Sequence, residues 1–306
     1  MQPLRGILLK IAAVTTFMVM ASLIKATSNN IPAGEAVFFR SFFALPVIFL
    51  WLWSTNDLRT GLKTSNPWQH LWRGLIGTCA MGLGFMGLGL LPLPEATAIG
   101  FASPVLAVIF AIVLLGEKIK AFRISTVILG LIGVLIILSP RLANLSSNGL
   151  NGGETLGAIV VLGSAACAAL AQIFTRKLVK IEKTVTIVFY FTISSTTLSL
   201  LTIPFGWVLP SFNEVALLIM SGIAGGVGQT LLTSSYRFAP TAVIAPFDYV
   251  AMLLALLVGY FIFDEVPTTI MLIGASVVIT AGFLIIWRES RLGLSRSKSR
   301  KISANN

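Results

Sequence analysis

A few polar side chains interrupt the long apolar stretches of this sequence, and their types suit the binding of a polar solute. Arg40 stands in VFFRSFFALP, and a guanidinium keeps its proton in a protein. Its planar fork matches a carboxylate, a phosphate or a pair of carbonyl oxygens. Asp248, in PFDYV, can bind a solute, take up a proton or pair with Arg40. Arg40 therefore either faces a solute or is a structural cation that pairs with an internal carboxylate or with carbonyl groups.

Three further candidates lie in similar surroundings, each with two interpretations. Glu95 follows LPLP in the first turn of a predicted helix, where the helix dipole alone favours an acid. Gln229 suits either a cavity wall or a hydrogen bond between helices. Tyr249 stands beside Asp248 and offers a ring on which a solute can stack. We expect solute binding or coupling at some of these positions.

The sequence lacks the groups that catalysis needs. An intramembrane lipid-modifying enzyme, the remote alternative, requires clustered carboxylates or a nucleophile with a base. The single histidine, His70, lies in a polar stretch that we expect to be solvated at the membrane interface. Cys79 and Cys167 are expected to be packing residues. We therefore predict no enzyme activity, no catalytic residue, no metal and no cofactor, and the absence of a G-x-x-x-x-G-K-[ST] motif leaves a gradient or facilitated flow as the energy source.

The elements that position these residues are predicted to be membrane-spanning helices. Hydrophobic residues make up 56% of the 306 residues and charged residues only 11%, against about 25% in average soluble proteins. About 20 helical residues cross a bilayer. The candidate spans are 4–26, 33–53, 71–91, 95–115, 122–139, 155–175, 185–207, 214–235, 241–263 and 268–287. The expected partners are thus the lipid bilayer and a small-molecule substrate; the net charge of +11 lies in loops and tails and does not indicate nucleic acid.

Basic residues predict the orientation. With a cytoplasmic N-terminus, the inner segments carry 19 Lys and Arg residues, Lys10 and Arg73 among them, and the outer segments carry only Lys25 and Arg141. Such a bias places the basic side in the cytoplasm. We expect both termini to be cytoplasmic and the protein to cross the cell inner (plasma) membrane several times.

The two halves of the sequence resemble each other. An offset of 151 residues pairs Gly6 with Gly157, and an offset of 148 pairs Gly74 with Gly222. Each half has five spans, an odd number, so the second half must insert upside down. Two inverted five-helix repeats are typical of secondary transporters that bind their substrate near the midplane. The predicted division is a first repeat at 4–139, a linker at 140–154, a second repeat at 155–287 and a basic cytoplasmic tail at 288–306.

Small residues and prolines predict how the helices pack. Gly77, Gly84 and Gly87 form a smooth face of the third span, and Gly222 and Gly226 do so in the eighth. Smooth faces let helices approach closely, whether for static packing or for sliding. Prolines inside the fourth and ninth spans free backbone carbonyls, which is tolerated where a helix lines a cavity. We therefore expect these two spans to be cavity walls.

The chain resembles the drug/metabolite transporter superfamily, in its EamA branch, over residues 5–287. The resemblance rests on the five-plus-five repeat, Gly116-Glu117 after the fourth span, its echo Asp264-Glu265 after the ninth, and Arg40 in an aromatic second span. It implies transport of a small metabolite by alternating access. The stretch around Arg40 is most similar to the riboflavin uptake group, which makes riboflavin the leading substrate; S-adenosylmethionine carriage and amino acid or drug export are the alternatives. Asp264 departs from the glycine usual in that motif.

Overall fold

The computed structural model describes residues 3–54, 62–115, 121–148, 153–239, 241–284 and 287. Within these residues every regular element is a helix, which confirms the all-α fold class. The first half contains α1 (Pro3–Thr27), α2 (Ala33–Phe42), α3 (Leu45–Ser54), α4 (Pro67–Leu90), α5 (Leu93–Gly100), α6 (Ala102–Leu115) and α7 (Ala121–Asn148). The second half contains α8 (Gly153–Leu178), α9 (Thr184–Leu200), η2 (Ile203–Phe205), α10 (Phe212–Phe238), α11 (Thr241–Ile244), η3 (Ala245–Tyr249), α12 (Val250–Phe263) and a last helix, Thr269–Leu284.

These helices form ten spans in two repeats of five. Five helical stretches among the described residues are long and apolar enough to cross a bilayer: α1, the α2–α3 pair, α4, α8 and α10. The α5–α6 pair, α7, α9, α12 with its short preceding turns, and the last helix supply the other five. The predicted architecture of ten transmembrane helices as two inverted five-helix repeats is thereby confirmed.

Prolines explain why some spans are broken. Proline has no backbone N–H, and its ring collides with the carbonyl four residues earlier. Pro46 stands four residues after Phe42, where α2 ends, and Pro104 stands four residues after Gly100, where α5 ends. In the ninth span, Pro246 lies in the 3-10 turn η3 that precedes α12. These breaks turn the second, fourth and ninth spans as they pass through the bundle.

The third span begins earlier than the sequence pattern predicts. α4 starts at Pro67 rather than at residue 71, because proline is favoured at the first helical position. The expectation of a solvated His70 is therefore wrong. The residue is part of α4, and its side chain is buried against neighbouring helices, with only 2% exposed. Its ring stacks 4.7 Å from the ring of Tyr190 on α9, which covers this turn of α4. Starting the helix at Pro67 also places Arg73 nearly two turns from the start of the helix, rather than at the edge of the predicted span.

The junction between the repeats differs from a simple linker. α7 continues through Pro140 to Asn148, and α8 begins at Gly153, so much of the predicted linker 140–154 is helical. The predicted Gly116-Glu117 motif and the tail from residue 288 lie outside the described residues.

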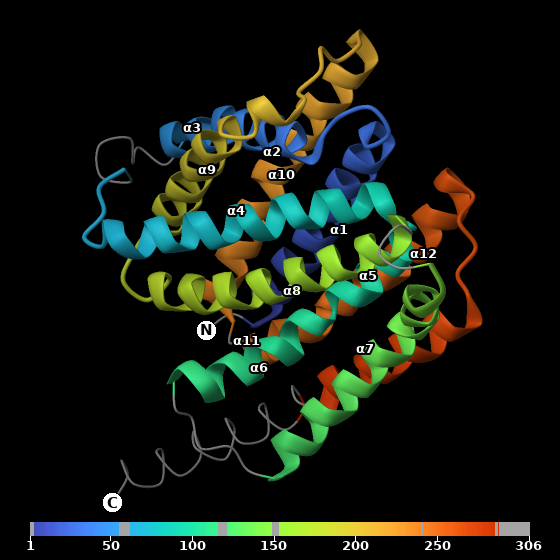
Figure 1. Cartoon of the computed structure of the whole chain (residues 1–306). Coiled ribbons are helices and arrows are strands. Elements are labelled where there is room, and N and C mark those ends of the chain that lie inside the picture. Colours follow the sequence, from blue (N-terminus) through green and yellow to red (C-terminus); the bar gives the residue numbers. More distant parts are fainter. Residues whose placement is uncertain are drawn as a thin grey trace, which may run out of the picture.

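Each main contact between the halves has an equivalent contact elsewhere in the bundle, related to it by the sequence offsets of 148 and 151 residues. The most extensive described contacts join α1 to α10 and α4 to α8, and Figure 1 shows α4 and α8 side by side. Gly74 on α4 faces Ser194 on α9, whereas Gly222 on α10 faces Phe43 at the end of α2. Gly74 and Gly222 are counterparts at 148 residues, and Phe43 and Ser194 are counterparts at 151. The two repeats therefore interlock through equivalent contacts.

The predicted packing glycines lie where helices approach closely. A Cβ atom built on Gly84 would lie 3.1 Å from the hydroxyl of Ser164, and one on Gly226 would lie 3.1 Å from Cα of Ala44. A Cβ on Gly87 would collide with Val161. These distances support the proposal that the glycines permit helix packing across the repeat interface.

We expect Gly222→Ala to lower the free energy of unfolding by about 1–3 kcal/mol, as overpacking typically does. The added Cβ would lie 2.5 Å from Cβ of Phe43 and 3.0 Å from the backbone oxygen of Phe39, so the backbone must move. Gly82→Ala on α4 is the matched control, because no atom lies within 4 Å of its added Cβ, and it should be neutral or slightly stabilising. Thermal unfolding in detergent compares the two; equal melting temperatures would refute the packing role of Gly222.

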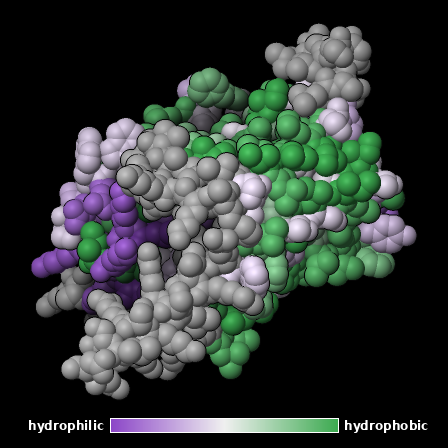
Figure 2. Space-filling view, turned by 90° about the horizontal axis from the view of Figure 1, so that it is seen from below, coloured by the Kyte–Doolittle hydropathy of each residue, from purple (hydrophilic) through white to green (hydrophobic). Residues whose placement is uncertain are grey.

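The surface of the bundle suits a lipid environment. Large apolar side chains are exposed on several helices, among them Leu131 and Leu135 on α7 and Leu253 and Leu257 on α12. Figure 2 shows hydrophobic residues over a broad part of one face, with hydrophilic residues gathered at one end. Soluble monomers rarely expose continuous apolar patches of this extent. The protein is thus a multi-pass membrane protein.

Candidate solute-binding cavity

A cavity of about 460 Å³ lies between the two repeats. This volume falls in the range of about 300–1,000 Å³ that small-molecule sites occupy. Helices of both halves line it: α1, α2, α4, α5, α6, α8, α9 and α10. Its polar lining consists of Arg40, Arg73, Thr97, Ser103, Ser164, Gln172, Thr175, Gln229, Thr233 and Tyr236. No carboxylate is among the described lining residues, so the cavity is electropositive.

Arg40 projects from α2 into this cavity and is 2% exposed. One Nη donates a hydrogen bond to the carbonyl of Gly225 at 3.2 Å. Its Cζ lies 5.7 Å from the centre of the Phe191 ring, which is a weak cation–π contact. Nε and the other Nη have no hydrogen-bond partner within the described part of the chain. A buried guanidinium that is only partly satisfied is expected to accept a ligand.

Arg73 on α4 lines the same cavity and is 7% exposed. Its Nε donates to the hydroxyl of Thr175 on α8 at 2.6 Å, and its Cζ lies 4.1 Å from the Phe191 ring centre. One Nη again has no partner among the residues that the structure covers. The distribution of basic residues assigned Arg73 to a cytoplasmic segment, so Arg73 was not predicted to line the cavity. Pro67 could have revealed this position, because a proline at the first helical position starts α4 six residues before Arg73 and so places Arg73 below the membrane surface.

The two buried arginines place positive charge in the cavity without an acidic partner in its described lining. Both guanidinium groups contact the single Phe191 ring, and no acidic side chain in the described lining neutralises them. Removing charges from water costs several kcal/mol per ion unless a partner compensates. An anionic group bound between Arg40 and Arg73 provides that compensation.

Gln229 also lines the cavity, from α10. Its amide nitrogen donates a long hydrogen bond of 3.4 Å to Thr233, one helical turn onward. Both side chains are buried and both line the cavity. They add neutral hydrogen-bonding groups to the lining that also holds the two arginines.

Asp248 pairs with Lys10 and not with Arg40, the partner that the sequence suggested. Its carboxylate lies 2.6 Å from Nζ of Lys10 on α1, so it forms an ion pair there and not with Arg40. Lys10 was assigned to the inner surface segment, yet its side chain is only 4% exposed. The pair lies on η3 and α1, and neither residue is among the described lining of the cavity.

The other two candidates also lie away from the described cavity lining. Tyr249 packs edge-on against Phe101, with ring centres 5.2 Å apart, and its hydroxyl lies against Gly282. Glu95 is buried in the first turn of α5. Of the five predicted side chains, the structure therefore brings Arg40 and Gln229 together. Of the two predicted walls, the fourth span lines the cavity, whereas no described residue of the ninth does.

An ion pair between the repeats, which we call the Glu265 latch, bonds to the backbone of Leu88 and Leu93, two residues that line the cavity. Nζ of Lys25 on α1 lies 2.9 Å from Glu265 and donates to the carbonyls of Leu91 and Leu88 at 2.7 and 3.1 Å. The other oxygen of Glu265 accepts the backbone N–H of Leu93 at 2.7 Å. The latch thus joins α1, the α4–α5 turn and the end of α12.

Asp264, the residue before Glu265, stands where the family motif usually has glycine. Asp264 has φ of 53° and adopts the left-handed conformation that usually requires glycine. Aspartate and asparagine enter this region more readily than other side chains. The backbone N–H of Glu265 then turns back to the carbonyl of Gly259 at 2.8 Å. Asp264 thus adopts a backbone conformation that glycine also adopts readily.

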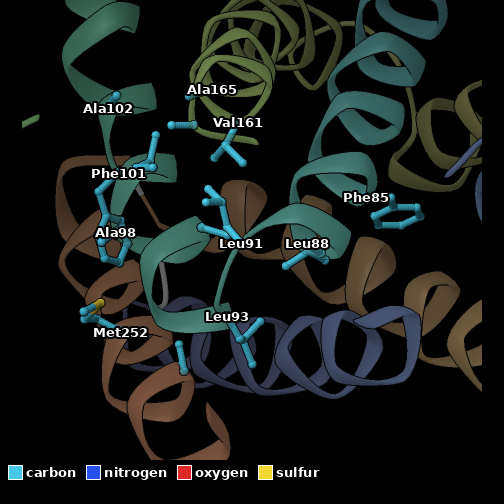
Figure 3. Close-up of a cluster of buried hydrophobic side chains, with 14 of the residues drawn as sticks. Phe85, Leu88, Leu91, Leu93, Ala98, Phe101, Ala102, Val161, Ala165 and Met252 are labelled. Carbon is cyan, nitrogen blue, oxygen red and sulfur yellow. The ribbon is translucent and has the colours of Figure 1, made fainter. Parts of the chain in front are cut away.

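Apolar side chains fill the space behind the latch. Leu88, Leu91 and Leu93 of the α4–α5 turn belong to one buried cluster with Val161 of α8 and Phe101. Figure 3 shows these side chains gathered around the turn.

The sequence profile of the EamA-like transporter family matches residues 4–139 and 155–287. The chain belongs to this family. The match covers both five-helix halves, so the resemblance seen in the sequence to the drug/metabolite transporter superfamily is confirmed. A solved crystal structure shares the fold, with a TM-score of 0.66 and 19% identity, over 94% of this chain and 98% of that chain.

Relatives of this EamA-like transporter carry different named substrates. The S-adenosylmethionine uptake transporter of Rickettsia prowazekii is 28% identical over 97% of both chains. The pseudopaline exporter of Pseudomonas aeruginosa is 29% identical over 90% of this chain and 94% of its own. The riboflavin transporter of Rhizobium johnstonii is 27% identical over 85% of this chain and 83% of its own. The chain is thus a small-molecule transporter.

Proposed function

We propose that this transporter works by alternating access and binds its solute between Arg40 and Arg73. The observation that carries the proposal is the cavity between inverted repeats, whose described lining contains no acid and into which two guanidinium groups project, only partly satisfied within the described residues. Arginine forks bind carboxylates in a defined orientation. A carboxylate-bearing metabolite is therefore the substrate class that the cavity fits best.

S-adenosylmethionine is the first substrate to test. Its carboxylate suits the two arginines, and its adenine ring suits the aromatic lining of Phe191 and Tyr236. Its ammonium and sulfonium groups find no carboxylate in the described lining, so the match rests on the carboxylate and the ring. The name of the Rickettsia prowazekii relative, which spans nearly the whole chain, supports this choice.

Riboflavin is the second candidate. The Arg40 stretch resembles the riboflavin uptake group, and one relative is named a riboflavin transporter. Riboflavin has no carboxylate, but its ring presents paired carbonyl acceptors that a guanidinium fork can bind.

We further propose that the protein lies in the cell inner membrane. The basic residues favour an orientation with both termini in the cytoplasm. In this orientation the Glu265 latch lies towards the outer side. A solute gradient or exchange supplies the energy, and the chain performs no catalysis.

Counterflow into liposomes that contain the purified protein tests the substrate. We expect labelled S-adenosylmethionine to accumulate saturably and unlabelled compound to compete. Riboflavin in the same assay separates the two candidates. Failure of both compounds, with the protein folded and inserted, would refute the substrate assignment, and turnover of a lipid would refute the carrier assignment.

A further inference from the structure

A second cavity, of about 510 Å³, lies apart from the solute cavity and shares none of its lining residues. We call it the basic pocket. It is formed where α1 begins, α3 and α10 end and α9 begins. Its lining consists of Arg5, Leu9, Trp51, Lys183, Thr184, Val185, Thr230, Ser234, Arg237 and Phe238. Nothing in the proposed transport of a solute uses these residues.

Three cations and no carboxylate line the basic pocket as described. Arg5 lies over the ring of Phe238 at 4.2 Å, which fixes its guanidinium at the pocket wall. Arg237 donates to the backbone carbonyl of Glu182. The carboxylate of Glu182 accepts hydrogen bonds from residues of the α3–α4 connection instead, so it does not neutralise the pocket.

Two buried hydroxyl groups also lie in the wall. Thr184 is 5% exposed, and its Oγ1 has no hydrogen-bond partner in the described structure. The same holds for Oγ1 of Thr230, on α10. Leaving buried hydroxyls unpaired costs stability, which a ligand with acceptor oxygens offsets. Thr184 is also the first residue of the 17-residue helix α9, whose N-terminal N–H groups favour an anion.

We propose that the basic pocket binds the phosphate group of an anionic phospholipid. Cationic side chains, free hydroxyls and a helix N-terminus are together the donor set that a phosphate accepts. Leu9, Val185 and the rings of Trp51 and Phe238 give the same pocket an apolar wall, which suits the glycerol and acyl portion of a lipid rather than free phosphate. Basic pockets between transmembrane helices are suited to such headgroups.

Removing the two hydroxyl groups should affect the melting temperature differently without and with lipid. In Thr184→Val/Thr230→Val the unpaired hydroxyls are gone, so the lipid-free protein in detergent should melt at the same or a higher temperature than wild type. Phosphatidylglycerol should raise the melting temperature of the wild type. We expect the double variant to lose at least half of that rise. A full rise in the variant would overturn the role of the two threonines.

The charges give a second test, read by native mass spectrometry of the full chain with added lipid. Arg5→Gln/Lys183→Gln should weaken phosphatidylglycerol binding about thirtyfold, from the attraction expected for two basic residues near an anionic lipid. The matched control is Lys177→Gln/Lys180→Gln, which removes the same charge from exposed positions outside the pocket. Equal losses in both variants would reduce the effect to overall charge and overturn the site.

Two further ligands identify the source of the phosphate. Zwitterionic phosphatidylcholine should bind more weakly than phosphatidylglycerol, and inorganic phosphate alone should not raise the melting temperature. A rise with inorganic phosphate that equals the rise with phosphatidylglycerol would overturn the assignment to a lipid. Because the readouts are binding and melting, they are independent of whether the transported solute has been identified.

Discussion

Arg40→Gln is expected to reduce solute uptake by about 100-fold while leaving the protein folded and inserted. The guanidinium projects into the solute cavity, and two of its nitrogens have no partner among the residues that the structure describes. A bound anion therefore loses a charged partner when the guanidinium is removed. The fold gains from the same change, because a buried charge that no carboxylate neutralises is gone. Initial rates of uptake in proteoliposomes and melting temperature in detergent measure the two effects separately.

Two controls sharpen this test. Arg40→Lys keeps the charge but loses the fork, and should retain only a fraction of the uptake. Ser41→Ala alters the neighbouring buried residue, which is not among the described lining of the cavity, and should transport normally. A protein that fails to insert after Arg40→Gln would establish the structural interpretation of Arg40. Normal uptake by that variant would remove Arg40 from the solute site.

Breaking the Glu265 latch is expected to have the largest effect on stability. Glu265→Gln leaves Lys25, with its side chain 12% exposed, without a counter-charge, and it weakens the bond to the N–H of Leu93. Breaking a buried pair costs about 3–5 kcal/mol. Since both partners keep some exposure to solvent, we expect a loss of about 2–3 kcal/mol in the free energy of unfolding.

A double-mutant cycle isolates the pair. Lys25→Met/Glu265→Gln should recover part of the stability lost in Glu265→Gln, because the uncompensated cation is also removed. Glu214→Gln, at an exposed hydrogen bond to Asn30 near the same end, is the control and should change stability little. Additive losses from Lys25→Met and Glu265→Gln would show that the two residues do not act as a latch.

The sequence predicted the scaffold well because bilayer thickness and hydrophobic length determine spans directly. The number of spans and the inverted repeat follow from local patterns and parity. The pairing of charges does not, because it depends on which helices touch. Lys10 was assigned to the surface by its charge, and Arg40 was the only cation suggested as a partner for Asp248; the fold instead brings Lys10 and Asp248 within 2.6 Å. Arg73 was missed because its depth depends on the residue at which α4 begins.

The contacts of Gly77 and Gly225 place unlike side chains at equivalent points of the two repeats. Gly77 contacts Phe191, and its counterpart Gly225 contacts Arg40, the counterpart of Phe191. If the two repeats were identical, a two-fold rotation would relate them, and the site would offer its solute the same affinity on both membrane faces. Here the cation comes from one repeat and the ring from the other, so the proposed inward-facing and outward-facing states are not equivalent under that rotation. We therefore expect the half-saturating solute concentrations on the two membrane faces to differ.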